Sequence, residues 1–356
     1  MNFSRVNKLI TQANINNCSG FMLKDSNNIK YFSGYTGEGI AIISENGCTI
    51  VTDGRYTEQA QKQADGFDVV EYKSGEYLET LYNTCDKMNL DAVCYEADVL
   101  SCDEFNTIKA AFGSINLVPT KAVGMTIRKI KDEAELEIMK KAAAVTDELL
   151  EMAFLLSKPG VSELDLDAEL AYLLRKKFKA ESAFDTIVAS GENGSMPHAF
   201  PTGRSFKKGD MVTLDFGAAL EGYKSDMTRT FSIGEPSPKM AEIYEIVREA
   251  QQMAQDALKP GIACKDVDAI ARNFIAEKGY GEYFAHGLGH GVGLNIHEFP
   301  RLAPTSNDIL QENMVVTVEP GIYLPGIGGV RIENTCIITK DGSKSVFSAS
   351  TDMVKL

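Results

Sequence analysis

Three absences limit what this chain of 356 residues can be. No apolar run approaches the roughly 20 residues of a membrane span, so we expect no insertion into a membrane. Acidic residues outnumber basic ones by 50 to 36, and the net charge of -14 argues against nucleic-acid binding. The stretch 1–17 has no apolar core segment, so we do not expect a secretory signal there.

Paired cysteine motifs are absent as well. The seven cysteines are an odd number, and none of them has CxxC or zinc-ribbon spacing. Free thiols in a reducing compartment account for them, which predicts a cytoplasmic protein. The chain is too long for one ordinary domain, and its 44% hydrophobic content is normal for a globular protein with a full core.

The first third of the chain alternates short β patterns with helical ones, which is typical of an α/β domain. We expect strands at Gly20–Leu23, Gly39–Ser44, Cys48–Thr52, Asp68–Tyr72 and Ala92–Tyr95. No glycine-rich phosphate loop follows any of them. Pro119 and Gly124 then interrupt the pattern, and a strong helix begins at Asp132. We therefore expect an N-terminal domain over residues 1–124 and a second domain over residues 125–356.

The second domain contains an internal repeat. The sequence KPGVSELDLDA, from Lys158, matches KPGIACKDVDA, from Lys259, 101 residues later. Each copy follows a helical segment and opens another, and β runs follow both. The shared order favours a duplication, so we predict an α+β domain of two related halves with the site in the crevice between them.

The stretch Met211–Phe231 reads as two β runs joined by a turn at Glu221-Gly222. If that turn has two residues, Leu220 faces Tyr223, and Asp215 and Asp226 project from one side of the ribbon. Two carboxylates placed so closely repel each other unless a positive charge lies between them. Taken alone, these residues fit a solvated polar face just as well.

All four histidines lie in the second domain: His198, His286, His290 and His297. The last three fall within the sequence HGLGHGVGLNIHE, and scattered structural histidines would not cluster in this way. The glycines between them favour neither helix nor strand. We interpret those glycines as room for a ligand or a metal close to the backbone.

Two glutamates lie in β-like segments, where an unpaired carboxylate is costly: Glu319 and Glu333. Alternation along the strands pairs each carboxylate with a polar neighbour on one face: Thr213 with Asp215, Thr317 with Glu319, and Arg331 with Glu333. Half-exposed strands would explain each pair singly, but not the histidines beside them. Four carboxylates and one histidine suit two divalent cations, and this oxygen-rich set favours Mn²⁺ over a thiolate-type zinc site. Co²⁺ and Zn²⁺ are the alternatives.

At these residues the chain resembles a known family. The second domain resembles the pita-bread metallopeptidases, and the whole chain is similar to their proline-specific branch, Xaa-Pro aminopeptidase and Xaa-Pro dipeptidase (prolidase). The matching stretches are MPHAFPTGR, TLDFGAALEGYKSDMTRTF, HGLGHGVGLNIHE, TVEPGIYLPG and GGVRIENT. The first domain resembles the creatinase-type N-terminal domain through weaker motifs such as TDGRYTEQA.

The resemblance implies a ligand set and a reaction. The implied metal ligands are Asp215, Asp226, His290, Glu319 and Glu333, with Asp215 and Glu333 bridging. The implied reaction is attack by a metal-bridging hydroxide on the peptide bond before proline in short peptides. The implied partner is a second copy of the chain, in a homodimer.

We assign roles around that centre as hypotheses. Glu319 is the candidate general base, and His198 and His297 would hydrogen-bond the substrate or the developing oxyanion. His286 would shape the proline side of the pocket, and Arg331 would orient a ligand carboxylate.

Three other functions compete with this one. A creatinase-like, metal-free hydrolase shares the architecture, but it would not be expected to keep this ligand set. A methionine-aminopeptidase-like exopeptidase shares the five ligands by resemblance, but it usually lacks a large N-terminal domain and counterparts of His286 and Arg331. A non-catalytic binding module of the same fold has no reason to keep every ligand and pocket histidine. The sequence does not distinguish dipeptidase activity from aminopeptidase activity.

Overall fold

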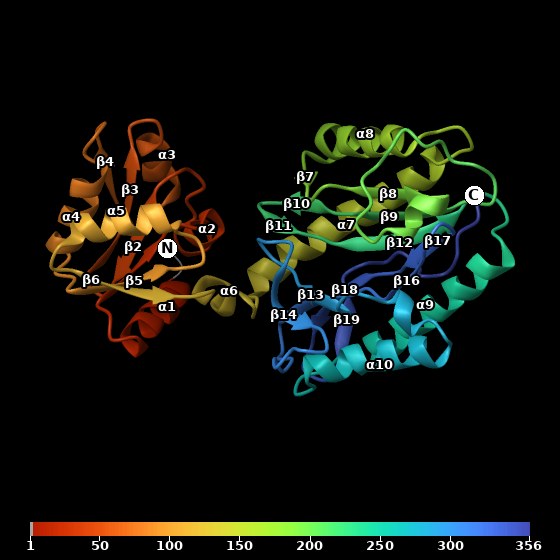
Figure 1. Ribbon diagram of the computed structural model, residues 1–356. Coiled ribbons are helices and arrows are strands. Elements are labelled where there is room, and N and C mark those ends of the chain that lie inside the picture. The colour runs from red at the N-terminus through yellow and green to blue at the C-terminus, as the bar shows by residue number, and fades with distance from the viewer. Residues whose placement is uncertain (1–2) are drawn as a thin grey trace. The chain divides into compact units, whose positions relative to one another are not determined.

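The computed structural model describes residues 3–356, and the chain forms two compact units, Met1–Arg128 and Lys129–Leu356 (Figure 1). The expected domain boundary at residue 124 falls within helix α6 (Val123–Arg128) and stays a prediction. No helix in the stretch 3–356 is both long enough and apolar enough to cross a bilayer. All seven cysteines are free.

Unit 1 is an α/β structure with one six-stranded sheet, in the order β4-β3-β2-β1-β5-β6. Its strands are β1 (Gly20–Leu23), β2 (Ile40–Ser44), β3 (Gly47–Asp53), β4 (Asp68–Tyr72), β5 (Ala92–Glu96) and β6 (Asn116–Thr120). Its helices, besides α6, are α1 (Phe3–Ile15), α2 (Ser26–Ser33), α3 (Thr57–Gln63), α4 (Tyr77–Lys87) and α5 (Cys102–Phe112). The α/β prediction for this part of the chain is confirmed.

The sequence patterns missed three elements of unit 1, and helix α6 is one of them. Strand β6 contains Pro119, which we interpreted as an interruption of the β pattern. Because β6 is an edge strand, it tolerates a residue without an N–H. Helix α2 is short and polar at its start. It is fixed locally, because the Asp25 side chain caps its N-terminus and Gly34 ends it in the left-handed conformation (φ 82°).

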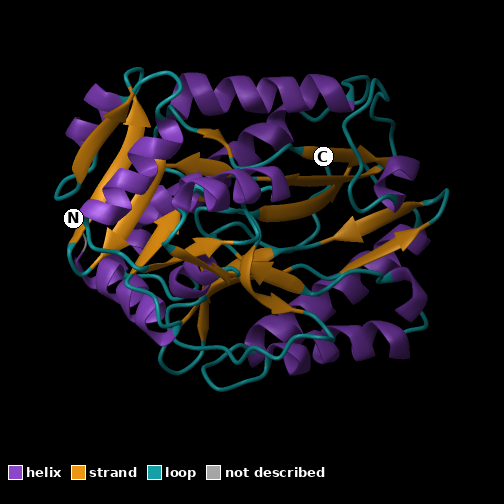
Figure 2. Cartoon of the chain, turned by 60° about the vertical axis from the view of Figure 1, so that its left-hand side comes forward, coloured by secondary structure: helices purple, strands orange, loops and turns teal. Residues whose placement is uncertain are grey.

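Unit 2 is an α+β structure in which helices cover several small sheets (Figures 1 and 2). Its helices are α7 (Glu133–Leu156), α8 (Glu163–Leu173), α9 (Pro238–Ala257) and α10 (Cys264–Glu277), with a π-turn η1 (Leu174–Phe178) and two 3₁₀ turns, η2 (Gly191–Ser195) and η3 (Gly281–Tyr283). Helix α7 begins where we expected, because Asp132 and Glu135 form a reciprocal capping box.

The strands of unit 2 fall into four sheets. A three-stranded sheet contains β8 (Ile187–Ser190), β9 (Met211–Phe216) and β12 (Met227–Ser232), and another contains β7 (Glu181–Ser182), β10 (Ala218–Leu220) and β11 (Tyr223–Lys224). The five-stranded sheet contains β13 (Gly289–Gly291), β14 (Glu298–Leu302), β15 (Val315–Val318), β18 (Asn334–Ile338) and β19 (Ser343–Ser345). Strands β16 (Gly321–Leu324) and β17 (Gly328–Arg331) pair with each other.

The two halves of unit 2 repeat one design. Two helices precede three neighbouring antiparallel strands in each half, α7 and α8 before β8-β9-β12 and α9 and α10 before β13-β15-β18. The backbone bonds around the two KPG sequences also match. Gly160 N–H donates to the Phe206 carbonyl at 3.0 Å, and Gly261 N–H donates to the Leu310 carbonyl at 2.9 Å. The predicted internal repeat is therefore confirmed.

Each half buries its own apolar core, so each half holds its strands against its own helices. The first core includes Leu149, Leu166, Leu214 and Phe231. The second includes Val247, Val267, Val316 and Val318. Both cores leave the polar ends of the central strands to meet between the halves.

Candidate metal centre

The two aspartates lie where the hairpin prediction placed them. Leu220 pairs with Tyr223, and the register continues from there to Phe216 and Met227. Asp215 lies in β9, and Asp226 immediately precedes β12. Both side chains line the same cavity, as expected for a diagonal pair on one face of the ribbon.

The two glutamates approach the aspartates from the second half. Glu319 follows β15, and its Oε1 accepts a hydrogen bond from Thr317 Oγ1 at 3.0 Å. Glu333 lies between β17 and β18 and is 1% exposed. Its Oε2 accepts a hydrogen bond from Thr228 Oγ1, on β12, at 2.7 Å. Carboxylates from four separate segments therefore converge across the two halves.

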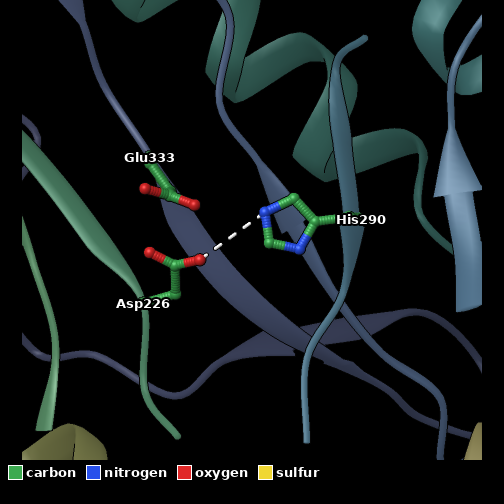
Figure 3. A group of neighbouring side chains, drawn as sticks. All are labelled: Asp226, His290 and Glu333. Carbon is green, nitrogen blue, oxygen red and sulfur yellow. Dashed lines mark ion pairs between the residues drawn. The ribbon is translucent and has the colours of Figure 1, made fainter. Parts of the chain in front are cut away.

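His290, on β13, completes a group that can hold a metal ion. Its Nε2 lies 3.6 Å from Asp226 Oδ2 and 3.3 Å from Glu319 Oε1. One ligand atom each from Asp226, His290 and Glu333 lies within 4.8 Å of the others, and the three side chains point toward one another (Figure 3). Asp215 and Glu319 line the same cavity without belonging to this three-residue group.

Burial makes the negative charges of this cluster expensive. It raises the pKa of Asp226 well above its ordinary value, and the charge of Asp215 adds to the effect. Burial and the charge of Asp226 do the same to the pKa of Glu333. Burial also raises the pKa of Asp215, against the opposing charge of Arg331. These carboxyl groups therefore favour protonation unless a cation joins them.

His290 and Glu319 form a charged pair within the cluster. Burial opposes the imidazolium, but the hydrogen bond and charge of Glu319 raise the pKa of His290 to about 9. Burial likewise opposes the carboxylate, but His290 lowers the pKa of Glu319 to about 2. A metal ligand must be a neutral imidazole, so a cation would replace the proton on His290.

Two oxygen atoms of the cluster give an argument for a bound cation that does not depend on the pKa shifts. Asp215 Oδ1 and Glu333 Oε1 are buried and have no hydrogen-bond partner within the described part of the chain. Buried polar atoms in native proteins are rarely left without a partner. The oxygen-rich donor set and these two atoms together fit a divalent cation.

The other three predicted histidines line the same cavity, of about 380 Å³. His198 lies on the loop between η2 and β9 and is exposed. His297 stacks edge-to-face on His290, with the ring centroids 4.4 Å apart. His286 Nε2 lies 2.8 Å from the Tyr323 hydroxyl, and its Nδ1 lies 2.7 Å from the Gly287 carbonyl.

Arg331 contacts Asp215 rather than Glu333, its neighbour on the chain. Its Nη2 lies 2.7 Å from Asp215 Oδ2, and its Nη1 donates to the Pro197 carbonyl at 3.1 Å and to the Tyr323 hydroxyl at 3.0 Å. Arg331 is 3% exposed, so this cation faces the cluster without solvent between them. It therefore holds Asp215 and the backbone beside His198 in one arrangement.

The glycines near the histidines have a packing role that we did not expect, and their expected approach to a ligand or metal stays a prediction. A Cβ atom on Gly289 would lie 2.1 Å from the Thr317 carbonyl oxygen, and one on Gly291 would lie 2.2 Å from the Phe299 carbonyl oxygen. Neighbouring strands therefore occupy the position that a side chain would take at Gly289 and Gly291, while Gly287 and Gly289 also line the cavity. The glycines permit close strand packing around His290.

The sequence missed other residues of the cavity. Tyr323 is buried and links His286 to Arg331, yet it lies in an ordinary β pattern with no charge to mark it. The sequence GIYL did not indicate this role for Tyr323, because such a sequence fits any buried strand. The cavity walls also include Phe184, Ile187, Ile296 and Arg301.

Two family descriptions match the chain over most of its length. "Metallopeptidase family M24" matches residues 137–340, and "Creatinase/Prolidase N-terminal domain" matches residues 5–130. The first covers the repeat and every residue of the metal cluster. The second covers nearly the whole of unit 1.

Full-length relatives and solved structures are similar to this chain. The Xaa-Pro dipeptidase of Pyrococcus horikoshii is 36% identical over 356 residues, covering 98% of each chain. The structure of an Xaa-Pro dipeptidase from Bacillus anthracis has a TM-score of 0.96 at 38% identity, covering 99% of each chain. An X-Pro aminopeptidase structure from Thermotoga maritima has a TM-score of 0.90 at 36% identity, covering 99% of this chain and 100% of that one.

Proposed function

Because this chain belongs to metallopeptidase family M24, we propose that it hydrolyses the bond between an N-terminal residue and a following proline. The observation that carries the proposal is the three-residue group of Asp226, His290 and Glu333, set in a cavity with three further histidines. Relatives named for this reaction, similar over 98% of the chain, support the choice of substrate. The creatinase/prolidase-type N-terminal domain argues against the methionine-specific alternative.

We propose that two divalent cations are the cofactor, with Mn²⁺ favoured and Co²⁺ or Zn²⁺ as alternatives. The proposed ligands are Asp215, Asp226, His290, Glu319 and Glu333, which all line one cavity. Four carboxylates balance two dications in formal charge, and oxygen ligands suit Mn²⁺. Bound in pairs, such cations would lower the pKa of a water molecule and polarise the substrate carbonyl.

Glu319 is the proposed proton acceptor. Its Oε1 lies 3.3 Å from His290 Nε2, and its side chain lines the cavity together with the other proposed ligands. An ionised carboxylate at the edge of the cluster can take a proton from the attacking water and pass it on. The hydrogen bond from Thr317 Oγ1 holds it in place.

The contacts of the histidines divide their proposed roles. Both ring nitrogens of His286 are engaged, by Tyr323 and by the Gly287 carbonyl, so His286 shapes the pocket. Among residues 3–356, no hydrogen bond occupies the ring nitrogens of His198 or His297, so these two can face the substrate. Burial lowers the pKa of His297, which keeps it neutral and able to donate or accept. The nitrogen of the substrate's proline belongs to a tertiary amide without an N–H. It must therefore receive a proton when the peptide bond breaks.

We carry two finer assignments forward as proposals. Named relatives include both dipeptidases and an aminopeptidase, so chain-length preference is part of the test. A homodimer in the cytoplasm is the proposed form, and light scattering on the purified chain measures its mass directly.

The experiment compares hydrolysis of Ala-Pro, Ala-Pro-Ala, Ala-Ala and Met-Ala by Mn²⁺-loaded protein, alongside metal analysis of the same sample. We expect cleavage before proline only, with Asp226→Asn inactive and depleted of metal. Preference for Ala-Pro would assign a dipeptidase, and preference for Ala-Pro-Ala would assign an aminopeptidase. Cleavage of Met-Ala without the proline peptides, or full activity of Asp226→Asn, would remove the proposal.

A further inference from the structure

Glu163 is a buried carboxylate that the proposed mechanism does not use. It is the first residue of α8 and has no exposed surface. A glutamate in the first turn of a helix ordinarily faces solvent and complements the helix dipole. Here the segment that carries His198 covers it instead.

The Glu163 carboxylate accepts hydrogen bonds from both ends of that segment. At the entry, Oε1 accepts from Ser190 N at 2.7 Å and from Ser190 Oγ at 2.7 Å. At the exit, Oε2 accepts from Thr202 N at 3.0 Å and from Thr202 Oγ1 at 2.6 Å. Asn193 Nδ2 reaches both oxygens, at 3.1 Å and 3.0 Å. One side chain therefore closes the loop of residues 191–201.

The backbone of α8 reinforces the closure. Glu163 N–H donates to the Arg204 carbonyl and Leu164 N–H donates to the Thr202 carbonyl, both at 3.1 Å. The loop is held a third time on its cavity side, where Arg331 donates to the Pro197 carbonyl. With its ends fixed by Glu163 and its middle fixed by Arg331, the loop holds His198 at the cavity.

We propose that Glu163 is a positioning residue that fixes the loop of His198 over the metal cluster. The role assigned to His198 rests on the proposed function, whereas the placement of the loop does not. Glu163 touches neither the cavity nor the cluster, so its effect on hydrolysis passes through His198. A second carboxylate holds the other half in a related way, because Asp268 on α10 binds Arg272, which donates to the His286 carbonyl at 2.7 Å.

Glu163→Gln tests this assignment with almost no change of volume. The hydroxyl groups and the Asn193 amide can turn to suit a glutamine, but the backbone N–H groups of Ser190 and Thr202 cannot. One of them must face the new NH₂ group and lose its acceptor. We expect kcat on Ala-Pro to fall on the order of 10- to 100-fold with KM and Mn²⁺ affinity unchanged.

Two readouts separate positioning from general stability. In a double-mutant cycle, adding Glu163→Gln to His198→Ala should lower kcat no further. Glu163 acts through the imidazole of His198, which His198→Ala has already removed. In Zn²⁺-loaded protein labelled with ¹⁵N-histidine, only the His198 signals should shift or broaden. Additive losses in the cycle, or an unchanged His198 signal in Glu163→Gln, would overturn the assignment.

Control variants keep the outcome interpretable. Asp165 lies in the same first turn of α8, and among residues 3–356 its carboxylate hydrogen-bonds only with Ser162, so Asp165→Asn should leave the His198 signal and kcat unchanged. If Glu163→Gln does not fold, Asn193→Ala and Thr202→Val remove donors from the loop side and should shift the same signal, and an unchanged signal in both counts against the proposal. If the wild-type chain does not cleave Ala-Pro, the proposed function fails while the His198 spectrum still tests Glu163.

Discussion

Arg331, which is buried, and Asp215, which is partly buried, form an ion pair across the two halves of the second unit, with Nη2 2.7 Å from Oδ2. The arginine comes from the end of β17 in the second half, and the aspartate comes from β9 in the first. The same guanidinium holds the backbone of Pro197, one residue before His198. A single cation therefore ties a proposed ligand to the loop of a proposed substrate-binding histidine.

We expect Arg331→Ala to destabilise the metal-free protein by about 3 kcal/mol or more, because it leaves Asp215 buried without its partner. Arg331→Lys keeps the charge but not the fork of donors, so it should recover part of the stability and little of the activity. Urea unfolding and Ala-Pro hydrolysis measure the two effects. Wild-type stability in Arg331→Ala would show that the pair contributes nothing to the fold.

Metal removal should lower the free energy of unfolding, because the carboxylates of the cluster then lack the cation between them. At a Mn²⁺ concentration about 100 times Kd, we expect each bound cation to raise the free energy of unfolding by about 2.7 kcal/mol over that of the EDTA-treated protein. Glu333→Gln should lose most of this gain, because it removes one ligand of the three-residue group. Thermal unfolding with and without metal gives the comparison. An equal gain in Glu333→Gln would place the cation elsewhere.

His297→Ala should keep its metal and lose turnover. The ring stacks on His290, but our assignment gives the metal to His290 and the substrate to His297. Loss of one hydrogen bond to a developing oxyanion typically lowers kcat on the order of 100- to 1,000-fold. Metal content and kcat are measured on the same sample, with His290→Ala as the metal-deficient control. If His297→Ala loses metal instead, the two roles must be exchanged.

The sequence predicted the residues that bear charge more readily than those that place them. Glu319 and Glu333 stand out because carboxylates are unusual among Val and Ile in β patterns. Tyr323 could not be found in this way, because a tyrosine in a buried strand is ordinary. Glu163 was hidden for another reason, since an acidic first turn normally indicates an exposed helix start. Its burial depends on a loop that lies 27 to 39 residues further along the chain.

Glu96 gives unit 1 a pH dependence of its own. Burial raises its pKa above the ordinary 4.5, so the folded state binds the proton more tightly than the unfolded state does. Stability should therefore fall as the pH rises from about 4.5 through the raised pKa. Glu104, whose pKa is about 2 because of Lys24, has the opposite dependence and loses its contribution only at lower pH.

Native-state hydrogen exchange at Lys24 and Asp25 measures this effect, because both amides donate to Glu96 Oε2, at 2.6 Å and 2.8 Å. We expect a smaller opening free energy at about pH 8 than at about pH 5, after correction for the intrinsic exchange rate. Glu96→Gln should remove the difference. A rise in opening free energy with pH would contradict the direction of the shift.

Lys131 and Glu298 form a second buried ion pair beside the site, with Nζ 3.3 Å from Oε2 and both side chains 1% exposed. Glu298 follows His297 and also accepts from Asn295 N–H, so this pair fixes the segment that presents His297. Lys131→Met alone should cost about 3–5 kcal/mol, because it removes the lysine partner of a buried carboxylate.

The double variant Lys131→Met with Glu298→Gln removes both charges and keeps an acceptor for Asn295. It should recover most of the stability lost in Lys131→Met, since a neutral buried pair avoids the desolvation penalty. Urea unfolding of the two single variants and the double variant completes the cycle. Equal stability of Lys131→Met and the wild type would show that Glu298 does not depend on this lysine, and that other contacts of Glu298 fix the segment of His297.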